Sequence, residues 1–159
     1  MSMIGCYISL PAAEVQKVDD DEEFLANVLG EQDDRPNLCI EKSWQGIHYA
    51  LNGDPWKGSG PLFNAVLGGK EVGEDLGYGP ARILSPEEVA ETAKALDAIS
   101  MEDFENRVSK CDFTSDQIYV YAGEDPDEIV EELGTYFADL QTFFNEAAQR
   151  CDAMLIFLS

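Results

Sequence analysis

The segment from residue 126 to residue 150 constrains the fold of this chain more than any other. Apolar side chains recur there every three or four residues, which predicts one long helix with a continuous apolar stripe. The stripe consists of Ile129, Leu133, Phe137, Leu140, Phe144, Ala148 and Cys151. Asp125, Pro126 and Glu128 give this helix a capped start, and the apolar run MLIFLS follows it as a buried strand. The chain must therefore build a core that covers both.

The other elements predict an α+β fold. Strands are expected at residues 3–10, 81–84 and 117–123, with a brief extended stretch after residue 36. Helices are expected at residues 12–18, 22–29, 44–51, 61–67, 101–110 and from residue 86 onward. Ser43, Ser85 and Ser100 are the expected N-caps. Because no repeat and no linker interrupt it, residues 1–159 are predicted to form a single domain, mostly helical, with a small mixed sheet built from the N-terminal, central and C-terminal strands.

The cysteines are expected to be reduced core residues. Cys6, Cys39, Cys111 and Cys151 lie far apart and form no C-x-x-C pair, which favours scattered thiols over a disulfide framework or a metal site. The N-terminus lacks the basic region of an export signal. The longest apolar run, AMLIFL, is far shorter than the ~20 residues of a membrane-spanning helix. The expected compartment is the cytoplasm.

The charge of the chain narrows the classes of partner. The sequence has 32 acidic and 10 basic residues, for a formal net charge of −22. Such a surface repels phosphate backbones and anionic lipid, so neither nucleic acid nor a membrane is an expected partner. Two explanations of the acidity stay open. The carboxylates solvate the surface and adapt it to salt, or one face meets a basic protein such as a toxin.

Residues 43–53, SWQGIHYALNG, hold one of the two tryptophans and the only histidine. On a helix over residues 44–51, Trp44, Ile47, His48 and Leu51 share one face. A histidine on an apolar face is usually a core residue whose ring nitrogens meet carbonyls or a carboxylate. A general base or a ligand contact is the main alternative. A metal ligand is the least favoured role, because the chain has no second histidine.

Nine of the 13 glycines lie between Trp44 and Pro80. They are expected to supply left-handed turns and close packing around the aromatic residues of this segment. The alternative is a small-molecule pocket walled by those aromatics, with Arg82 as an anchor for an anionic group. A buried partner for a carboxylate is the other interpretation of Arg82. The candidate pocket residues are Trp44, His48, Tyr49, Asp54, Trp56, Tyr78 and Arg82.

The sequence offers no recognisable catalytic set. The glycine-rich segment has neither the third glycine of a dinucleotide loop nor the lysine of a P-loop. Ser59 lies between glycines but not in a G-x-S-x-G elbow, and Cys39 or Cys111 could use His48 only through tertiary proximity. We therefore expect no catalytic residues, no metal and no cofactor, and we expect a protein that is not an enzyme.

Residues 41–89 resemble a known family. EKSWQGIHYALNG, PLFNAVLGG and DLGYGPARILSPEEV, in this order, are similar to the signature of the YfbM-like bacterial proteins, a domain of unknown function. The opening MSMIGCYISL and the closing aromatic helix with its apolar strand fit the same pattern. The resemblance implies a single α+β domain of bacterial origin, with no established activity to carry over.

Three functional hypotheses follow from these features. The first is a non-catalytic acidic protein that binds a basic partner, as immunity proteins bind toxins. Its candidate binding residues are Glu124, Asp127, Glu128, Glu131 and Glu132, and the acidic run at residues 19–23 is second. The second is a small-molecule-binding domain or enzyme that uses the pocket around His48. The third is a soluble oligomeric domain without a dedicated ligand.

Overall fold

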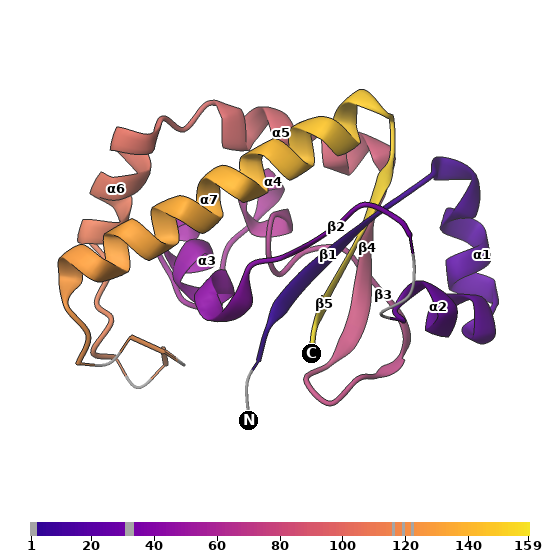
Figure 1. The fold of residues 1–159 in the computed structure, drawn as a ribbon, viewed down its shortest axis with the longest axis horizontal. Helices are drawn as coiled ribbons and strands as arrows, with labels where there is room; N and C mark the ends of the chain where they lie inside the picture. The colour runs from indigo at the N-terminus through magenta and orange to yellow at the C-terminus, as the bar shows by residue number, and fades with distance from the viewer. Residues whose placement is uncertain (1–2, 31–33, 116, 119, 122) are drawn as a thin grey trace.

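A computed structural model describes residues 3–30, 34–115, 117, 118, 120, 121 and 123–159. Its centre is one five-stranded sheet in the order β2-β1-β5-β4-β3. The strands are β1 (Gly5–Leu10), β2 (Asn37–Cys39), β3 (Lys70–Asp75), β4 (Pro80–Leu84) and β5 (Ala153–Leu158). The N-terminal and C-terminal strands are neighbours, so the two ends of the chain lie close together at one end of the sheet (Figure 1).

Helices cover both faces of the sheet (Figure 1). The helices are α1 (Val15–Asp20), α2 (Glu22–Val28), α3 (Trp44–Asn52), α4 (Gly60–Asn64), α5 (Pro86–Asp97), α6 (Met101–Ser109) and α7 (Pro126–Gln149). The short 3-10 helices η1 (Ala12–Glu14) and η2 (Glu41–Ser43) precede α1 and α3. The smaller α1 and α2 pack on one face, and α3 to α7 pack on the other. The predicted α+β class is confirmed.

Side chains of the central strands alternate between two hydrophobic clusters. In β1, Tyr7 belongs to the larger cluster beneath α7, whereas Ile8 and Leu10 belong to the smaller cluster beneath α1 and α2. In β5, Met154 and Leu155 divide between the clusters in the same way. Because both faces are covered, these strands are mostly apolar rather than apolar at alternate positions only, with Ser9 as a buried polar exception, which explains the runs in the sequence.

The sheet is antiparallel in every described pairing, not mixed as the sequence suggested. Whether two neighbouring strands run parallel or antiparallel depends on the segments that connect them. The residues of the strands themselves do not encode it. The edge strand β3 was also missed, because its residues KEVGED are mostly polar and exposed. Gly73 has a φ of 73° at its bulge, where a Cβ would lie 2.5 Å from Leu25 of α2.

The predicted strand at residues 117–123 is wrong for the residues that the structure describes. Tyr121 has a φ of 78°, in the left-handed region that a β-strand does not adopt. Its ring is nevertheless buried between Phe113 and the larger cluster. The apolar character of the segment therefore reflects burial in a loop. Residues 119 and 122 lie outside the described residues.

The long helix α7 confirms the predicted stripe over most of its length. Ile129, Leu133, Phe137, Leu140 and Phe144 are all buried against the larger cluster. Cys151, the last residue of the predicted stripe, is exposed. It lies past the end of the helix with a φ of 58°, in the turn that leads into β5.

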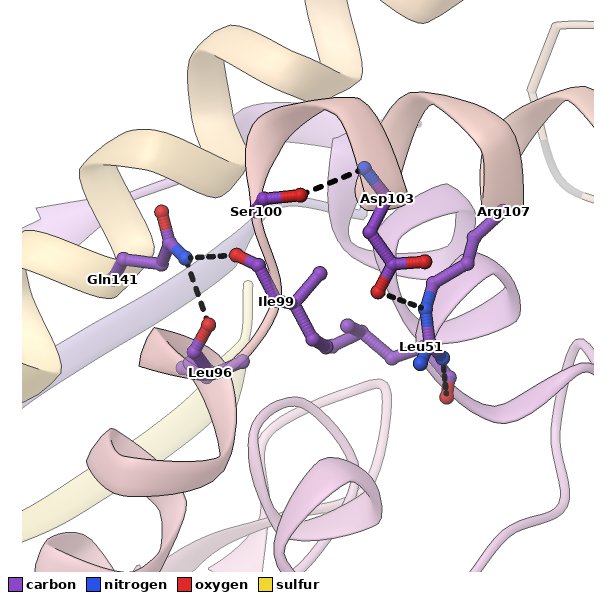
Figure 2. A network of polar contacts seen from close by, with 7 residues as sticks. All are labelled: Leu51, Leu96, Ile99, Ser100, Asp103, Arg107 and Gln141. Atoms are coloured by element: carbon purple, nitrogen blue, oxygen red, sulfur yellow. Dashed lines mark hydrogen bonds and ion pairs between the residues drawn. The ribbon is translucent and has the colours of Figure 1, made fainter.

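Polar contacts join α7 to the end of α5, and α6 to α3 (Figure 2). The side-chain amide of Gln141 donates hydrogen bonds to the carbonyls of Leu96, at 2.8 Å, and Ile99, at 3.0 Å. Leu96 lies in the last turn of α5, where its carbonyl also accepts from the amide of Ile99 at 3.1 Å, and Ile99 lies just past the end of the helix. Arg107 of α6 donates to the carbonyl of Leu51 near the end of α3, at 3.4 Å. The four helices α3, α5, α6 and α7 are thus held by bonds to carbonyls at or just past helix ends as well as by apolar packing.

Most predicted helix starts are confirmed. Ser85 and Glu88 form a complete capping box, and the side chains of Ser100 and Asp125 accept from backbone amides of α6 and α7. Ser43 is the exception. It has helical φ and ψ, and its hydroxyl donates to the carbonyl of Ile40 instead of capping α3, because η2 runs directly into this helix.

The expectation of four reduced cysteines is wrong for one pair. Cys6 of β1 and Cys39 of β2 form a disulfide, and their Cα atoms lie 4.2 Å apart as direct partners in the antiparallel register. Cys111 and Cys151 are free. The 33 residues that separate the bonded pair in sequence hid this proximity. Among the described helices, none is long and apolar enough to cross a membrane.

Candidate functional site

The segment SWQGIHYALNG forms the most buried helix surface of the chain. Trp44, Ile47 and His48 of α3 are all fully buried, as the shared face predicts. Gly53 ends the helix in a left-handed conformation with a φ of 74°. This helix therefore brings the only histidine into the core.

Both ring nitrogens of His48 have partners within the protein. Nε2 lies 3.2 Å from the carbonyl oxygen of Lys57, and Nδ1 lies 3.3 Å from the side-chain amide nitrogen of Asn52. A carbonyl can only accept, so Nε2 carries the proton and donates to it, while Nδ1 accepts from Asn52. The ring edge of His48 also contacts Phe63 at 5.6 Å between centroids. The neutral ring thus ties α3 to the loop at Lys57 and to α4.

Burial lowers the pKa of His48 from its ordinary value of 6.5, although the bond to Lys57 and the nearby Asp54 oppose the shift. In the unfolded chain this histidine takes up a proton below about pH 6.5, whereas in the folded protein it does so only at a lower pH. The free energy of unfolding therefore falls as the pH drops from 6.5 toward the lowered pKa, by up to about 1.4 kcal/mol per pH unit.

We expect His48→Gln to remove this pH dependence. Glutamine can still donate to the carbonyl of Lys57 but does not titrate, so the stability gap between wild type and variant should shrink between pH 7.5 and pH 5.5. Urea unfolding at several pH values measures the gap. Parallel pH profiles would show that the ring is protonated equally easily in both states, contrary to its burial.

Trp56 and Asp54 lie beside this helix. The ring of Trp56 contacts Trp44, with 5.9 Å between centroids, and is 46% exposed. The carboxylate of Asp54 accepts from the backbone amides of Trp56 and Lys57 at 2.9 and 2.8 Å, and these two bonds lower its pKa. Asp54 thus shapes the turn that supplies the carbonyl partner of His48.

Arg82 of β4 binds backbone rather than a carboxylate. Its Nη1 donates to the carbonyls of Val66 and Gly68, both at 2.9 Å, and burial lowers its pKa. The hydroxyl of Tyr7 donates to the carbonyl of Ala65 at 2.6 Å. These two side chains anchor the turn after α4 on the sheet. The guanidinium therefore has a structural role at the place where an anionic ligand was one expectation.

The remaining pocket candidates lie apart from this cluster. Tyr49 points from α3 toward α6 and the following loop, where its hydroxyl accepts from the amide of Asp112 at 3.1 Å. Tyr78 lies in the turn between β3 and β4. The structure thus brings together Trp44, His48, Asp54, Trp56 and Arg82, whereas Tyr49 and Tyr78 belong to other surfaces.

An open groove of about 360 Å³ runs along the exposed side of α7 near its N-terminus. We call it the acidic groove; it is lined by Glu128, Glu131, Glu132, Thr135 and Tyr136. These positions follow the three-to-four spacing of one helical face, opposite the buried stripe. Three of the five candidate partner-binding residues line it. Glu124 precedes the helix and Asp127 lies in its first turn, both exposed.

Two groups that line the acidic groove, Glu132 and Tyr136, have raised pKa values. The pKa of Glu132 is raised by burial and by Glu124. The pKa of Tyr136 is raised by burial and by Glu41, Glu132 and Asp139. Within the described residues, no ion pair neutralises Glu128, Glu131 or Glu132. The groove is thus a concentration of like charge that a cation would relieve.

The sequence did not identify Tyr136 as part of this surface. Its position four residues after Glu132 and eight after Glu128 placed it on the acidic face of the helix, so the signal was present. Glu41 was harder to find, because it reaches this region from η2 only through tertiary packing.

Two further features of the described residues concern metal binding and the state of the Cys111 thiol. No group of three or more His, Cys, Asp or Glu side chains there is arranged to hold a metal ion. Burial raises the pKa of the Cys111 thiol to about 12, so this thiol is protonated at neutral pH.

Comparisons with known proteins show a family match and a similar fold. The family model described as "Domain of unknown function (DUF1877)" matches residues 1–157. The crystal structure of YfbM from Escherichia coli, a protein of unknown function, is similar with a TM-score of 0.72 and 18% sequence identity, over 99% of this chain and 100% of that one. At this identity the likeness shows the fold alone. No curated protein matches the chain.

Proposed function

Because this chain belongs to the DUF1877 family, a domain of unknown function, we propose a function from its own surface: it is a non-catalytic module that binds a basic protein through the acidic groove. The observation that carries the proposal is a groove of about 360 Å³ lined by three carboxylates and a tyrosine. A partner of the kind that fits is a cationic toxin, which an immunity-like protein would neutralise.

The geometry supports a protein partner in two ways. The groove joins carboxylates to the aromatic ring of Tyr136, and interface hot spots combine aromatic anchors with charge. A lysine or arginine placed in the groove would also offset the mutual repulsion of Glu124 and Glu132. With a net charge of −22, the long-range field attracts a cationic protein before contact.

A pocket around His48 receives less support as a ligand site. The ring is fully buried, its nitrogens bind Lys57 and Asn52, and Arg82 binds backbone carbonyls. A ligand would have to displace bonds that now hold the turn after α4. Within that cluster Trp56 is exposed and Asp54 is partly exposed, so a partner could contact them without entering the core.

A charge-reversed groove tests the proposal. We expect Glu124→Lys, Asp127→Lys, Glu131→Lys and Glu132→Lys together to abolish capture of the partner, because the variant repels a cationic surface. The helix should survive, since these side chains are exposed and the Asp125 cap is kept. The measurement is affinity capture from lysate of the source cells by immobilised wild type and variant, followed by association rates of the captured protein at increasing salt.

The matched control reverses four exposed carboxylates elsewhere, Glu74, Glu91, Glu105 and Glu146, and so has the same net charge. The partner should be basic, should bind wild type and control, and should associate more slowly as salt rises. Equal capture by the groove variant, with loss on His48→Gln or Arg82→Gln, would move the site to the alternative pocket.

A cytoplasmic location belongs to the same proposal. Two of the four cysteines, Cys111 and Cys151, are free, as is usual in a reducing compartment. In that compartment a disulfide is expected to be a reactive rather than a permanent feature. Cell fractionation with an antibody to the folded protein tests the location.

A further inference from the structure

The Cys6–Cys39 disulfide forms part of the wall of a pocket. This pocket, of about 400 Å³, lies on the face of the sheet covered by α1 and α2, and is separate from the acidic groove. Ile8 and Phe157 of the sheet and Val28 at the end of α2 give it an apolar lining, and Arg35 adds a guanidinium. Its volume is that of a small-molecule site.

The two cysteine residues differ in exposure, although both line the pocket. Cys6 is 6% exposed, in a strand with neighbours on both sides, β2 and β5. Cys39 is exposed, at the end of the three-residue edge strand β2. Disulfide exchange requires a thiolate to reach one of the sulfurs, and the choice of sulfur follows access. The greater exposure of Cys39 therefore favours attack by a thiol at this residue rather than at Cys6.

We propose that this disulfide is a thiol-exchange site, in which a low-molecular-weight thiol in the pocket attacks Cys39 Sγ and Cys6 leaves as the free thiol. The attacking thiolate forms a new S–S bond to Cys39 as the Cys6–Cys39 bond breaks. The electron pair of that bond goes to Cys6 Sγ, which takes up the proton that the attacking thiol released. A second thiol then attacks the mixed disulfide, giving the external disulfide and the Cys39 thiol. Two external thiols are oxidised and one cystine is reduced.

The pairing of β1 with β2 does not require the disulfide. Backbone bonds from the amide of Ile40 to the carbonyl of Gly5 and from the amide of Ser9 to the carbonyl of Pro36, both 2.9 Å, hold the two ends of β2 on β1. These bonds do not depend on the sulfurs. Exchange therefore changes the wall of the pocket while the strand order is kept.

The first test locates the adduct. The protein carries Cys111→Ser and Cys151→Ser, so that Cys6 and Cys39 are the only cysteines, and is treated while folded with 2-mercaptoethanol, a neutral thiol. The reaction is quenched with acid, free thiols are alkylated, and peptides are identified by mass. We expect the mixed disulfide on Cys39 and the alkyl group on Cys6. An adduct on Cys6, or a reaction seen only after unfolding, would overturn the proposal.

The second test uses charge beside the attacked sulfur. Asn37 is exposed and lies two residues before Cys39 on the same face of β2. The attacking thiolate is an anion, so Asn37→Lys should react about five-fold faster than Asn37→Glu at low salt, and added salt should reduce the difference. Glu91→Lys on α5 changes the net charge by as much as the difference between the two Asn37 variants, but far from the pocket, and should leave the rate near that of the parent. Equal rates for the two Asn37 variants would contradict attack at Cys39.

Discussion

Replacing Trp44 by alanine is expected to lower the free energy of unfolding by about 3–5 kcal/mol. The indole is fully buried, and its Nε1 donates to the carbonyl of Met3 at 2.9 Å, so truncation leaves both a cavity and a carbonyl without this donor. The backbone of β1 also approaches closely: a Cβ on Gly5 would lie 2.9 Å from that of Trp44. The strand cannot move in to fill the space without breaking its pairing with β5.

Urea unfolding followed by far-ultraviolet circular dichroism measures this loss without relying on tryptophan fluorescence. The neighbouring Trp56→Ala is the matched control, since its ring is 46% exposed and should cost about 1 kcal/mol or less. If Trp44→Ala kept near-wild-type stability, the indole would line a space that solvent or a ligand can occupy. The apolar face of α3 would then be a binding surface rather than core.

Local signals in the sequence predicted local structure well. The capping box at Ser85 and Glu88 and the cap at Ser100 require only residues three positions apart, so the sequence contains all the partners involved. The stripe of α7 repeats over many turns, which makes its burial predictable for the same reason. The burial of His48 was predictable in the same way, because it lies on the apolar face of a helix.

Features that depend on distant residues were predicted less well. The segment at residues 117–123 has the composition of a strand, but Tyr121 takes a left-handed φ to place its ring against Phe113. Strand β3 has a polar sequence, and its pairing with β4 makes it a strand. In both cases tertiary contacts outweigh the local pattern.

The candidate functional surfaces show the same difference between local and distant signals. Three carboxylates of the acidic groove were found because they share one helix, whereas Glu41 comes from a different element. The disulfide was missed because its two cysteines meet only when β2 pairs with β1. The spacing of the cysteines along the chain does not indicate that pairing.

Removing the disulfide is expected to have an effect of similar size to the loss of Trp44. The bond closes a loop between cysteines 33 residues apart, and the chain-entropy model assigns such a loop about 4 kcal/mol of stabilisation. For a domain of this length the melting temperature should fall by roughly 8–16 °C on reduction. The Cys6→Ala, Cys39→Ala double variant should lose a similar amount and should be insensitive to reductant.

The loss of stability on removing the disulfide has a different physical origin from that caused by Trp44→Ala. A cross-link acts mainly by restricting the unfolded chain, so its removal should let that chain expand and should increase the slope of unfolding free energy against urea. Trp44→Ala acts on the native core and should leave the slope unchanged. Reduced wild type and the double alanine variant should therefore share a steeper slope, with the native dichroism of the sheet preserved by the backbone bonds that flank β2. A loss below about 1 kcal/mol, with an unchanged slope, would mean that β1 and β2 remain associated in the unfolded chain and that the bond restricts nothing further.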